Sequence, residues 1–302
     1  MKINAKKINK LAIGTIWALV SVVVLILIFL LGYILVTGLP DISWKFLTST
    51  SSSISAGGGI RDQLFNSVYL LVLTIIISLP ISLEAGIYLA EYAKDNWITT
   101  LIKTAIEVLS SLPSIVVGLF GYLILVIKFQ LDYSILSGAI ALTIFNLPLL
   151  TRSVEDSIEE VPKLQREAGL SLGLSKSKTI VGVVLPLAIP GIITGVILSS
   201  GRIFGEAAAL IYTAGQSAPI VSYTDWNPFS PSSFLNPMRP AETLAVHIWK
   251  LNTEGIVPDA HIVSSGASAV LIIVILIFNL SSRFFGNWAY RKMTGTTRKK
   301  RG

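Results

Sequence analysis

Six long apolar stretches, separated by polar segments, organise the chain. Each is close to the roughly 20 residues that a helix needs to cross the hydrocarbon core of a membrane. The first run is much longer than the apolar core of about 7–15 residues in a secretory signal, so we expect a retained membrane helix. We therefore predict six spans, at about residues 11–36, 64–83, 106–127, 134–150, 185–213 and 262–280.

The polar segments complete this topology. Residues 37–60 and 216–259 are predicted to be long loops, the second of them rich in proline. Pro186 and Pro190 are predicted to mark a bend where the loop before the fifth span becomes a helix. Asn146 and Pro148 in the fourth span are interpreted as a bend in that helix rather than a binding site.

Composition supports a membrane protein. Hydrophobic residues make up 52% of the 302 residues, charged residues 14%, and the mean hydropathy is +0.72. A soluble chain of this length has no core large enough to bury so much apolar surface, so the predicted fold class is all-α integral membrane. Cysteine is absent and there are only two histidines, which leaves no basis for a disulfide or metal site, and no cofactor is expected in this chain.

The positive charges predict the orientation. Eighteen of the 24 lysines and arginines lie in the N-terminal segment, residues 84–103, the loop after the fourth span and the C-terminal tail. Five lie in the segments of the opposite face, and Arg202 lies inside the fifth span. Because cytoplasmic loops carry the excess of Lys and Arg, we predict that both termini and the loop after the fourth span are cytoplasmic. The net charge of +7 then reflects membrane orientation rather than nucleic-acid binding.

Residues 159–178 form a charged segment with the pattern of a short amphipathic helix. Its apolar residues recur at steps of three and four, and Pro162 lies near the start, where a missing N–H costs little. Gly169 and Gly173 require a reason, because glycine in a helix costs about 1 kcal/mol relative to alanine. Close approach to another surface and a C-terminal stop are the two candidates, with Lys176 and Lys178 placed to suit the negative helix end. The apolar stripe consists of Val161, Leu164, Ala168 and Leu172.

This segment resembles a known loop. Glu167-Ala168-Gly169, then Gly173 and then Val183-Val184-Leu185-Pro186 resemble the EAA motif of ABC-importer permeases of type I, which usually have alanine where this chain has Gly169. The resemblance implies a coupling helix that docks on a separate ATPase subunit. It implies ATPase-coupling roles for Leu164, Glu167, Ala168, Gly169 and Gly173. The alternative is an ordinary loop helix with a solvated charged face.

The chain is not expected to be an enzyme. It has no G-x-x-x-x-G-K-[ST] phosphate loop, and the nearest string, residues 173–179, has the wrong spacing and follows a predicted helix rather than a strand. Any ATP-Mg would therefore be used by a partner ATPase.

Arg202 and Glu206 are the candidate substrate path. They lie four residues apart in the predicted fifth span, so we expect both side chains on one helix face. A charged side chain at membrane depth costs about 2.5–3.5 kcal/mol on insertion scales, so it should face protein or a water-filled path. Arginine suits a phosphate-type oxyanion, and the carboxylate can accept the hydrogen bond that hydrogenphosphate offers and sulfate does not. The alternative is a structural ion pair. Gly201 and Gly205 are predicted to allow close helix packing beside it.

The surrounding residues resemble phosphate importer permeases of the PstA type. Arg202 with Gly205-Glu206-Ala207 resembles their R-x-x-G-E-[TA]-A segment, and residues 112–119 resemble a matching segment of the third span. The predicted division is an N-terminal helix and loop (1–61), a permease domain (62–285, with the coupling loop at 152–184) and a basic tail (286–302). The implied partners are a PstC-type permease, two copies of a PstB-type ATPase, a PstS-type phosphate-binding protein and membrane lipid, with no nucleic acid.

Three alternatives remain open at this stage. The first is a PstC-type partner permease or a permease for another oxyanion; competition of phosphate uptake by sulfate or molybdate would reveal the latter. The second is a secondary carrier driven by an ion gradient, which would leave the EAA spacing unexplained. A purely structural subunit would not need charges in the fifth span. His247 and Trp249 are interpreted as residues of the aromatic belt in an external loop.

Overall fold

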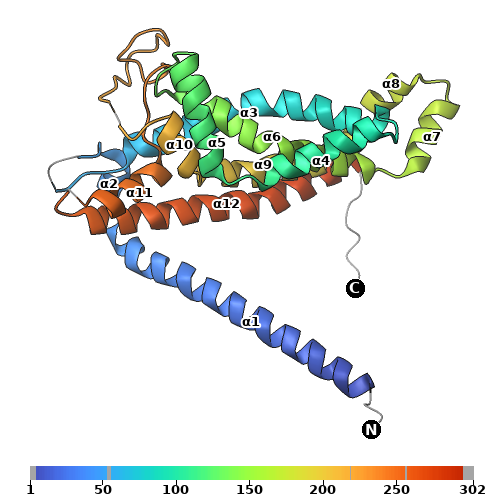
Figure 1. Cartoon of the computed structure of the whole chain (residues 1–302), viewed down its shortest axis with the longest axis horizontal. Helices are drawn as coiled ribbons and strands as arrows, with labels where there is room; N and C mark the ends of the chain where they lie inside the picture. The colour runs from blue at the N-terminus through green and yellow to red at the C-terminus, as the bar shows by residue number, and fades with distance from the viewer. Residues whose placement is uncertain (1–4, 53–55, 218, 256, 295–302) are drawn as a thin grey trace.

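The computed structural model describes residues 5–52, 56–217, 219–255 and 257–294. Within these ranges the regular secondary structure is helical and there is no strand (Figure 1). Five helices are long and apolar enough to cross a membrane, or six when one sharply bent pair is counted as a single span. The predicted fold class is therefore confirmed. The helices longer than one turn are α1 (Ala5–Gly38), α2 (Trp44–Thr48), α3 (Arg61–Ile87), α4 (Trp97–Ser111), α5 (Ser114–Gly121), α6 (Ile135–Glu159), α7 (Lys163–Ser171), α9 (Leu185–Phe204), α10 (Ala208–Thr213), α11 (Leu244–Glu254) and α12 (Ala260–Thr294).

Polar side chains at several helix starts explain where the helices begin. The Ser134 side chain accepts a hydrogen bond from Ser137 N–H at the start of α6, and Asn96 caps α4 in the same way. Thr243 accepts from Val246 N–H at the start of α11. Each cap satisfies an N–H that the first helical turn leaves without a partner inside the helix.

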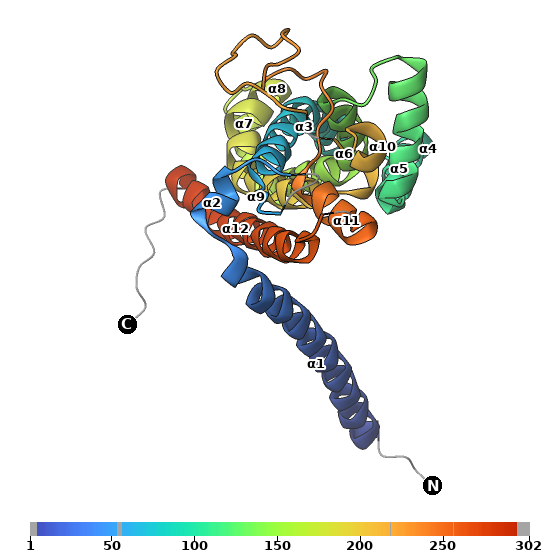
Figure 2. The same cartoon turned by 90° about the vertical axis from the view of Figure 1, so that its left-hand side faces the viewer.

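Helices α3, α6, α9 and α12 form the body of the molecule, whereas α1 extends away from it and meets α12 only near its C-terminal end (Figure 2). The apolar side chains of α1 are exposed along most of the helix, as expected for a helix whose solvent is lipid. Buried apolar residues form two clusters. One lies around Leu70, Leu142 and Leu210, and the other joins α6 to α9 through Val154, Val184 and neighbouring residues.

The third predicted span is not one straight helix. The segments Trp97–Ser111 and Ser114–Lys128 meet at an angle of 97°. Pro113 occupies the N-cap position of α5 and has no N–H with which to continue α4. The predicted span over residues 106–127 therefore contains a sharp break, which the apolar residues on both sides of the proline concealed.

The fifth predicted span begins earlier and ends earlier than expected. Helix starts with α8 (Lys176–Thr179) and continues through a π-helical turn, η4 (Ile180–Val184), into α9. The predicted loop-to-helix bend at Pro186 and Pro190 was wrong, because the helix runs through both prolines. Leu185 N–H bonds to Ile180 O, the long π register, just before the proline that cannot donate. The helix ends at Phe204, with Gly205 at its C-cap.

The two ends of the body collect different segments (Figure 1). One end carries α7, α8 and the end of α12, while the other carries α2, α11 and the segment after α10. This grouping matches the predicted division of the polar segments between two faces. The predicted loop 216–259 differs in one respect, because it contains α11, whose residues Leu244, Val246 and His247 are buried.

Candidate ATPase-coupling loop and anion path

The loop that carries the EAA-like motif is fastened to the end of α3. Arg166 on α7 donates from Nε to Oε1 of Glu91 over 2.6 Å. Its other guanidinium nitrogens donate to the carbonyl oxygens of Ile158, over 2.7 Å, and of Val161. Glu91 lies in η2 (Tyr88–Tyr92), the π-helical turn that continues α3. One arginine therefore joins the loop before α7 to the end of a membrane helix.

Lys176 makes the second attachment to the same turn. Its Nζ donates to the backbone oxygen of Glu91 and lies 4.8 Å from the ring centroid of Tyr92. Lys176 and Lys178 both lie in α8, beyond the end of α7, so neither lies in the last turn of the helix whose negative end they were predicted to suit. The amine of Lys176 instead contacts the negative, C-terminal end of η2, which lies beside α8 in the folded chain.

Both predicted roles of the loop glycines are confirmed. Gly169 is buried, and a Cβ at this position would lie 2.7 Å from Cγ2 of Thr179. Gly173 has a φ of +78°, and its N–H bonds to Leu170 O over 2.9 Å, so it ends α7 in a left-handed conformation. The first glycine lets α7 approach α8 closely, and the second reverses the chain between them.

The apolar stripe predicted for this segment does not pack against the rest of the chain. Val161 is buried, but Leu164 is 75% and Leu172 is 82% exposed, and Ala168 is exposed as well. Glu167 lies on the same exposed helix. Because apolar groups on a water-facing surface indicate a contact with another molecule, this surface of α7 is the candidate docking site. We call Leu164, Glu167, Ala168 and Leu172 the α7 surface.

Arg202 and Glu206 do not project from one helix face. Helix α9 ends at Phe204, and Glu206 lies in the break before α10, where its Oε1 accepts a hydrogen bond from Ala209 N–H over 3.3 Å. The guanidinium carbon of Arg202 lies 4.1 Å from the ring centroid of Phe145 on α6. Within the described ranges no carboxylate lies within ion-pair distance of Arg202. The expected geometry was therefore wrong, because Gly205 ends the helix between the two residues.

The side of α9 that carries Arg202 faces polar groups of α6. Ser199, one turn before Arg202, donates from Oγ to Oδ1 of the buried Asn146. Asn146 thus pairs with α9 instead of only marking a bend. Gly201 and Gly205 face α12, since a Cβ at Gly205 would lie 3.2 Å from Ile275 Cδ1. The predicted close packing beside Arg202 is confirmed at Gly205, whereas a Cβ at Gly201 would lie at an ordinary contact distance of 3.7 Å from Phe278 Cβ.

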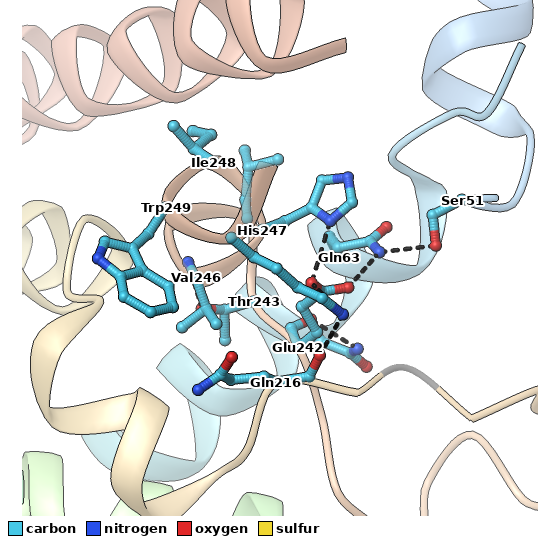
Figure 3. A network of polar contacts seen from close by, with 12 residues as sticks. Ser51, Gln63, Gln216, Glu242, Thr243, Val246, His247, Ile248 and Trp249 are labelled. Atoms are coloured by element: carbon cyan, nitrogen blue, oxygen red, sulfur yellow. Dashed lines mark hydrogen bonds and ion pairs between the residues drawn. The ribbon is translucent and has the colours of Figure 1, made fainter. Parts of the chain in front are cut away.

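Sequence reasoning missed a buried polar cluster at the opposite end of the body (Figure 3). Glu242 is 3% exposed, and its Oε2 accepts a hydrogen bond from Nε2 of Gln63 over 2.8 Å. Its Oε1 lies 3.1 Å from Nδ1 of His247 and 3.8 Å from Nζ of Lys250. Nε2 of Gln63 also donates to Ser51 Oγ over 2.8 Å. The carboxylate therefore connects α3, α11 and the segment before α3, and we call this group of residues the Glu242 cluster.

The charge of Glu242 is sustained by its neighbours. Burial raises the pKa of its carboxyl, but the contacts with His247, Gln63 and Lys250 outweigh burial, and the pKa lies below its ordinary value. Close by, burial lowers the pKa of Arg239, whose guanidinium donates to Asn66 Oδ1 over 2.7 Å.

A local signal for this cluster exists in the sequence. Gln63, Asn66 and Ser67 lie at steps of three and four at the start of an apolar span, and each contacts the 239–244 segment or its neighbours. A polar face on such a helix indicates buried polar partners. His247 belongs to this cluster and is 5% exposed, so its interpretation as an aromatic-belt residue was wrong.

Comparisons with known proteins agree with this architecture. Residues 82–295 match the family described as "Binding-protein-dependent transport system inner membrane component". The chain is 52% identical over 291 residues to "Probable ABC transporter permease protein YqgI" of Bacillus subtilis (strain 168), covering 96% of this chain and 99% of the relative. It is 31% identical over 260 residues to "Phosphate transport system permease protein PstA" of Yersinia pestis, covering 86% and 83%. A PstA 2 protein of Mycobacterium tuberculosis (strain CDC 1551 / Oshkosh) is also 31% identical, over 84% of this chain and 79% of the relative.

Solved structures show the same fold at low sequence identity. A chain of the MetNI methionine ABC transporter in an inward-facing conformation aligns with a TM-score of 0.55 at 15% identity, over 76% of this chain and 94% of its own length. A chain of an amino acid ABC transporter crystallised with histidines gives 0.51 at 17% identity, over 75% and 92%. The likeness concerns the fold alone. The matched residues, the apolar helices and the relatives together show that this chain belongs to the inner-membrane permease family of binding-protein-dependent ABC importers.

Proposed function

We propose that this chain is the PstA-type permease subunit of an importer for inorganic phosphate. The observation that carries the proposal is Arg202, a half-buried arginine that stacks on Phe145 at the end of α9. Within the described part of the chain it makes no ion pair, so its planar set of N–H donors is available to an oxyanion. Relatives named as phosphate transport permeases, 31% identical over more than four fifths of the chain, support the choice of phosphate.

Glu206 has a separate role in this proposal. Its Oε1 caps α10, and the carboxylate lies in the helix break that follows Arg202. A carboxylate accepts hydrogen bonds and cannot donate them, so it favours hydrogenphosphate, which carries a proton, over sulfate, which does not. It also offsets the charge of Arg202, which keeps the anion from binding too tightly to be released.

The α7 surface is proposed to dock on the ATPase. ABC importer permeases work with an ATPase and a substrate-binding protein, and we propose PstB-type and PstS-type subunits for these roles, with a PstC-type permease as the other half of the pathway. ATP and Mg²⁺ would be used by the ATPase alone. The exposed Leu164 and Leu172 supply the apolar contact, while Arg166 and Lys176 pass a displacement of the loop to Glu91 and the end of α3.

Phosphate uptake by the assembled transporter tests the proposal. Arg202→Gln and Glu206→Gln are each expected to lower uptake about tenfold or more, since a hydrogen bond to a charged group contributes about 1.5–3 kcal/mol. Arg283→Gln, a change at an exposed arginine of α12, is the matched control and should transport normally. Uptake at the wild-type rate by both assembled variants would show that these residues are structural.

The same assay separates the alternatives. Strong competition by unlabelled sulfate or molybdate would indicate a permease for another oxyanion. Uptake that survives ATP depletion but collapses with a protonophore would contradict an ATP-driven importer.

A further inference from the structure

The Glu242 cluster is connected to the helix break that carries Glu206. Nζ of Lys250, beside the Glu242 carboxylate, donates to Gln216 O over 2.9 Å. The backbone of the same segment repeats the connection, because Glu242 N–H bonds to Ser217 O and Ala241 N–H to Ala214 O. Residues 214–217 directly follow α10. The chain just after the C-terminal end of α10 is therefore hydrogen-bonded to the Glu242 cluster and its backbone.

Helix α10 is short and closely packed. It has six residues, which corresponds to about 9 Å of helix. Against α5, a Cβ at Gly118 would lie 2.8 Å from Ala209 Cα, which leaves no room for α10 to shift toward that helix. Its first turn is capped by Glu206 through Ala209 N–H. Glu206 and Gln216 thus lie just before and just after one short, closely packed helix.

Packing alone does not fix the position of Lys250. Two cavities flank this part of α11. One, of about 730 Å³, is lined by Gln216 and Pro240, and the other, of about 150 Å³, is lined by Ser51 and His247. Both are also lined by Lys250 and Glu254. Space on both sides means that the polar contacts of Lys250, rather than apolar neighbours, determine where its amine lies.

We propose that Glu242 is a positioning residue for the anion path: its ionised carboxylate holds Lys250 on Gln216 and thereby sets the position of α10 and Glu206. Neither Glu242 nor Lys250 would touch the transported anion in this arrangement. The proposal rests on the role proposed above for Arg202 and Glu206. The competing explanation is that the Glu242 cluster only stabilises the fold at this end of the body.

A single-cysteine reporter distinguishes these explanations. The chain has no cysteine, so Ala207→Cys places one thiol at the start of α10, and its rate of labelling by a membrane-permeant maleimide reports the exposure of the break. In the assembled transporter, Glu242→Gln is expected to change that rate about 3- to 30-fold, the range for residues that modulate coupling between sites. Glu242→Asp, which keeps the charge, should restore most of the wild-type rate.

Lys250→Gln provides an independent variant should Glu242→Gln fail to assemble. It removes the contact with Gln216 but leaves the carboxylate with Gln63 and His247, and the same change in labelling is expected. Asp225→Asn is the matched control, since this half-exposed carboxylate lies in the same segment between α10 and α11 and bonds to Asn227 and Ser232 rather than to either helix. It should label at the wild-type rate.

Two outcomes would overturn the proposal. Unchanged labelling of the Ala207→Cys reporter in assembled Glu242→Gln or Lys250→Gln transporters would show that the cluster does not position α10. A change that Glu242→Asp fails to reverse would point to lost packing instead of lost charge. Labelling does not depend on the identity of the substrate. Failure of the parent transporter to carry phosphate would therefore contradict the proposed function and leave this result intact.

Discussion

Arg166 donates a hydrogen bond to Glu91 over 2.6 Å and thereby joins two segments that lie 75 residues apart in the sequence. The carboxylate is 8% exposed and the guanidinium 21%, so water screens this ion pair only partly. The two residues belong to the helix that carries the EAA-like motif and to the end of a membrane helix. Helix α7 is therefore tied to the end of α3 by a directional contact.

Arg166→Gln is expected to loosen the α7 segment. The change leaves the nearly buried Glu91 without its cation and the carbonyls of Ile158 and Val161 without their donors, at a cost of about 2 kcal/mol. Hydrogen exchange of the α7 amides measures the effect. A double-mutant cycle with Glu91→Gln should give an interaction free energy of at least about 0.5 kcal/mol. Strictly additive effects would show that the two side chains do not act together.

The α7 surface should be important for coupling and unimportant for folding. Leu164→Ser and Leu172→Ser change exposed side chains, so the free energy of unfolding should change by less than about 0.5 kcal/mol. Co-purification of the ATPase and ATP-driven uptake should both fall sharply, because an apolar contact is lost. Ile220→Ser is the matched control, since this residue is 99% exposed at the opposite end of the body. Normal retention of the ATPase by both leucine variants would contradict docking at this surface.

Gly169→Ala should destabilise the loop in a way that a second substitution relieves. The added Cβ would lie 2.7 Å from Cγ2 of Thr179, and such overpacking costs about 1–3 kcal/mol. Thr179→Ser removes that methyl group, so the double variant should recover much of the lost thermal stability. Gly173→Ala serves as the comparison, because its strain comes from a φ of +78° with open space around it. Thr179→Ser should not rescue that variant.

Acid should weaken the Glu242 cluster. The pKa of Glu242 is lower in the folded chain than its ordinary value of 4.5, so its ionised contacts contribute stability above pH 4.5 that is lost as the pH falls through the folded-state pKa. His247 and Lys250 are the titratable groups that contact it. Protection of the α11 amides against hydrogen exchange, taken relative to the intrinsic exchange rate at each pH, should therefore fall below pH 4.5, and this fall should be much smaller in Glu242→Gln. Equal acid sensitivity of the two proteins would assign the effect to another group.

The sequence by itself determined the features that depend on local composition and periodicity. The number and approximate positions of the spans followed from apolar runs, and the turn at Gly173 followed from the spacing of glycines within a charged helix. These predictions succeeded because a helix in lipid satisfies its own backbone hydrogen bonds. Its length and polarity can therefore be recognised from one continuous segment of sequence. The grouping of the loops at two ends of the body followed for the same reason.

Only the tertiary structure decided where helices break and which distant polar groups meet. The bend at Pro113 and the end of α9 at Gly205 lie within apolar runs that resemble continuous spans, and the second break separates Arg202 from Glu206. Gln63 and Glu242 are 179 residues apart, and the sequence around either residue does not indicate that the other is its partner. Burial of a charge is stable only when its partners are brought to it by the packing of other helices. In this protein the packing of α3 against α11 meets that requirement, because side chains of both helices contact the Glu242 carboxylate.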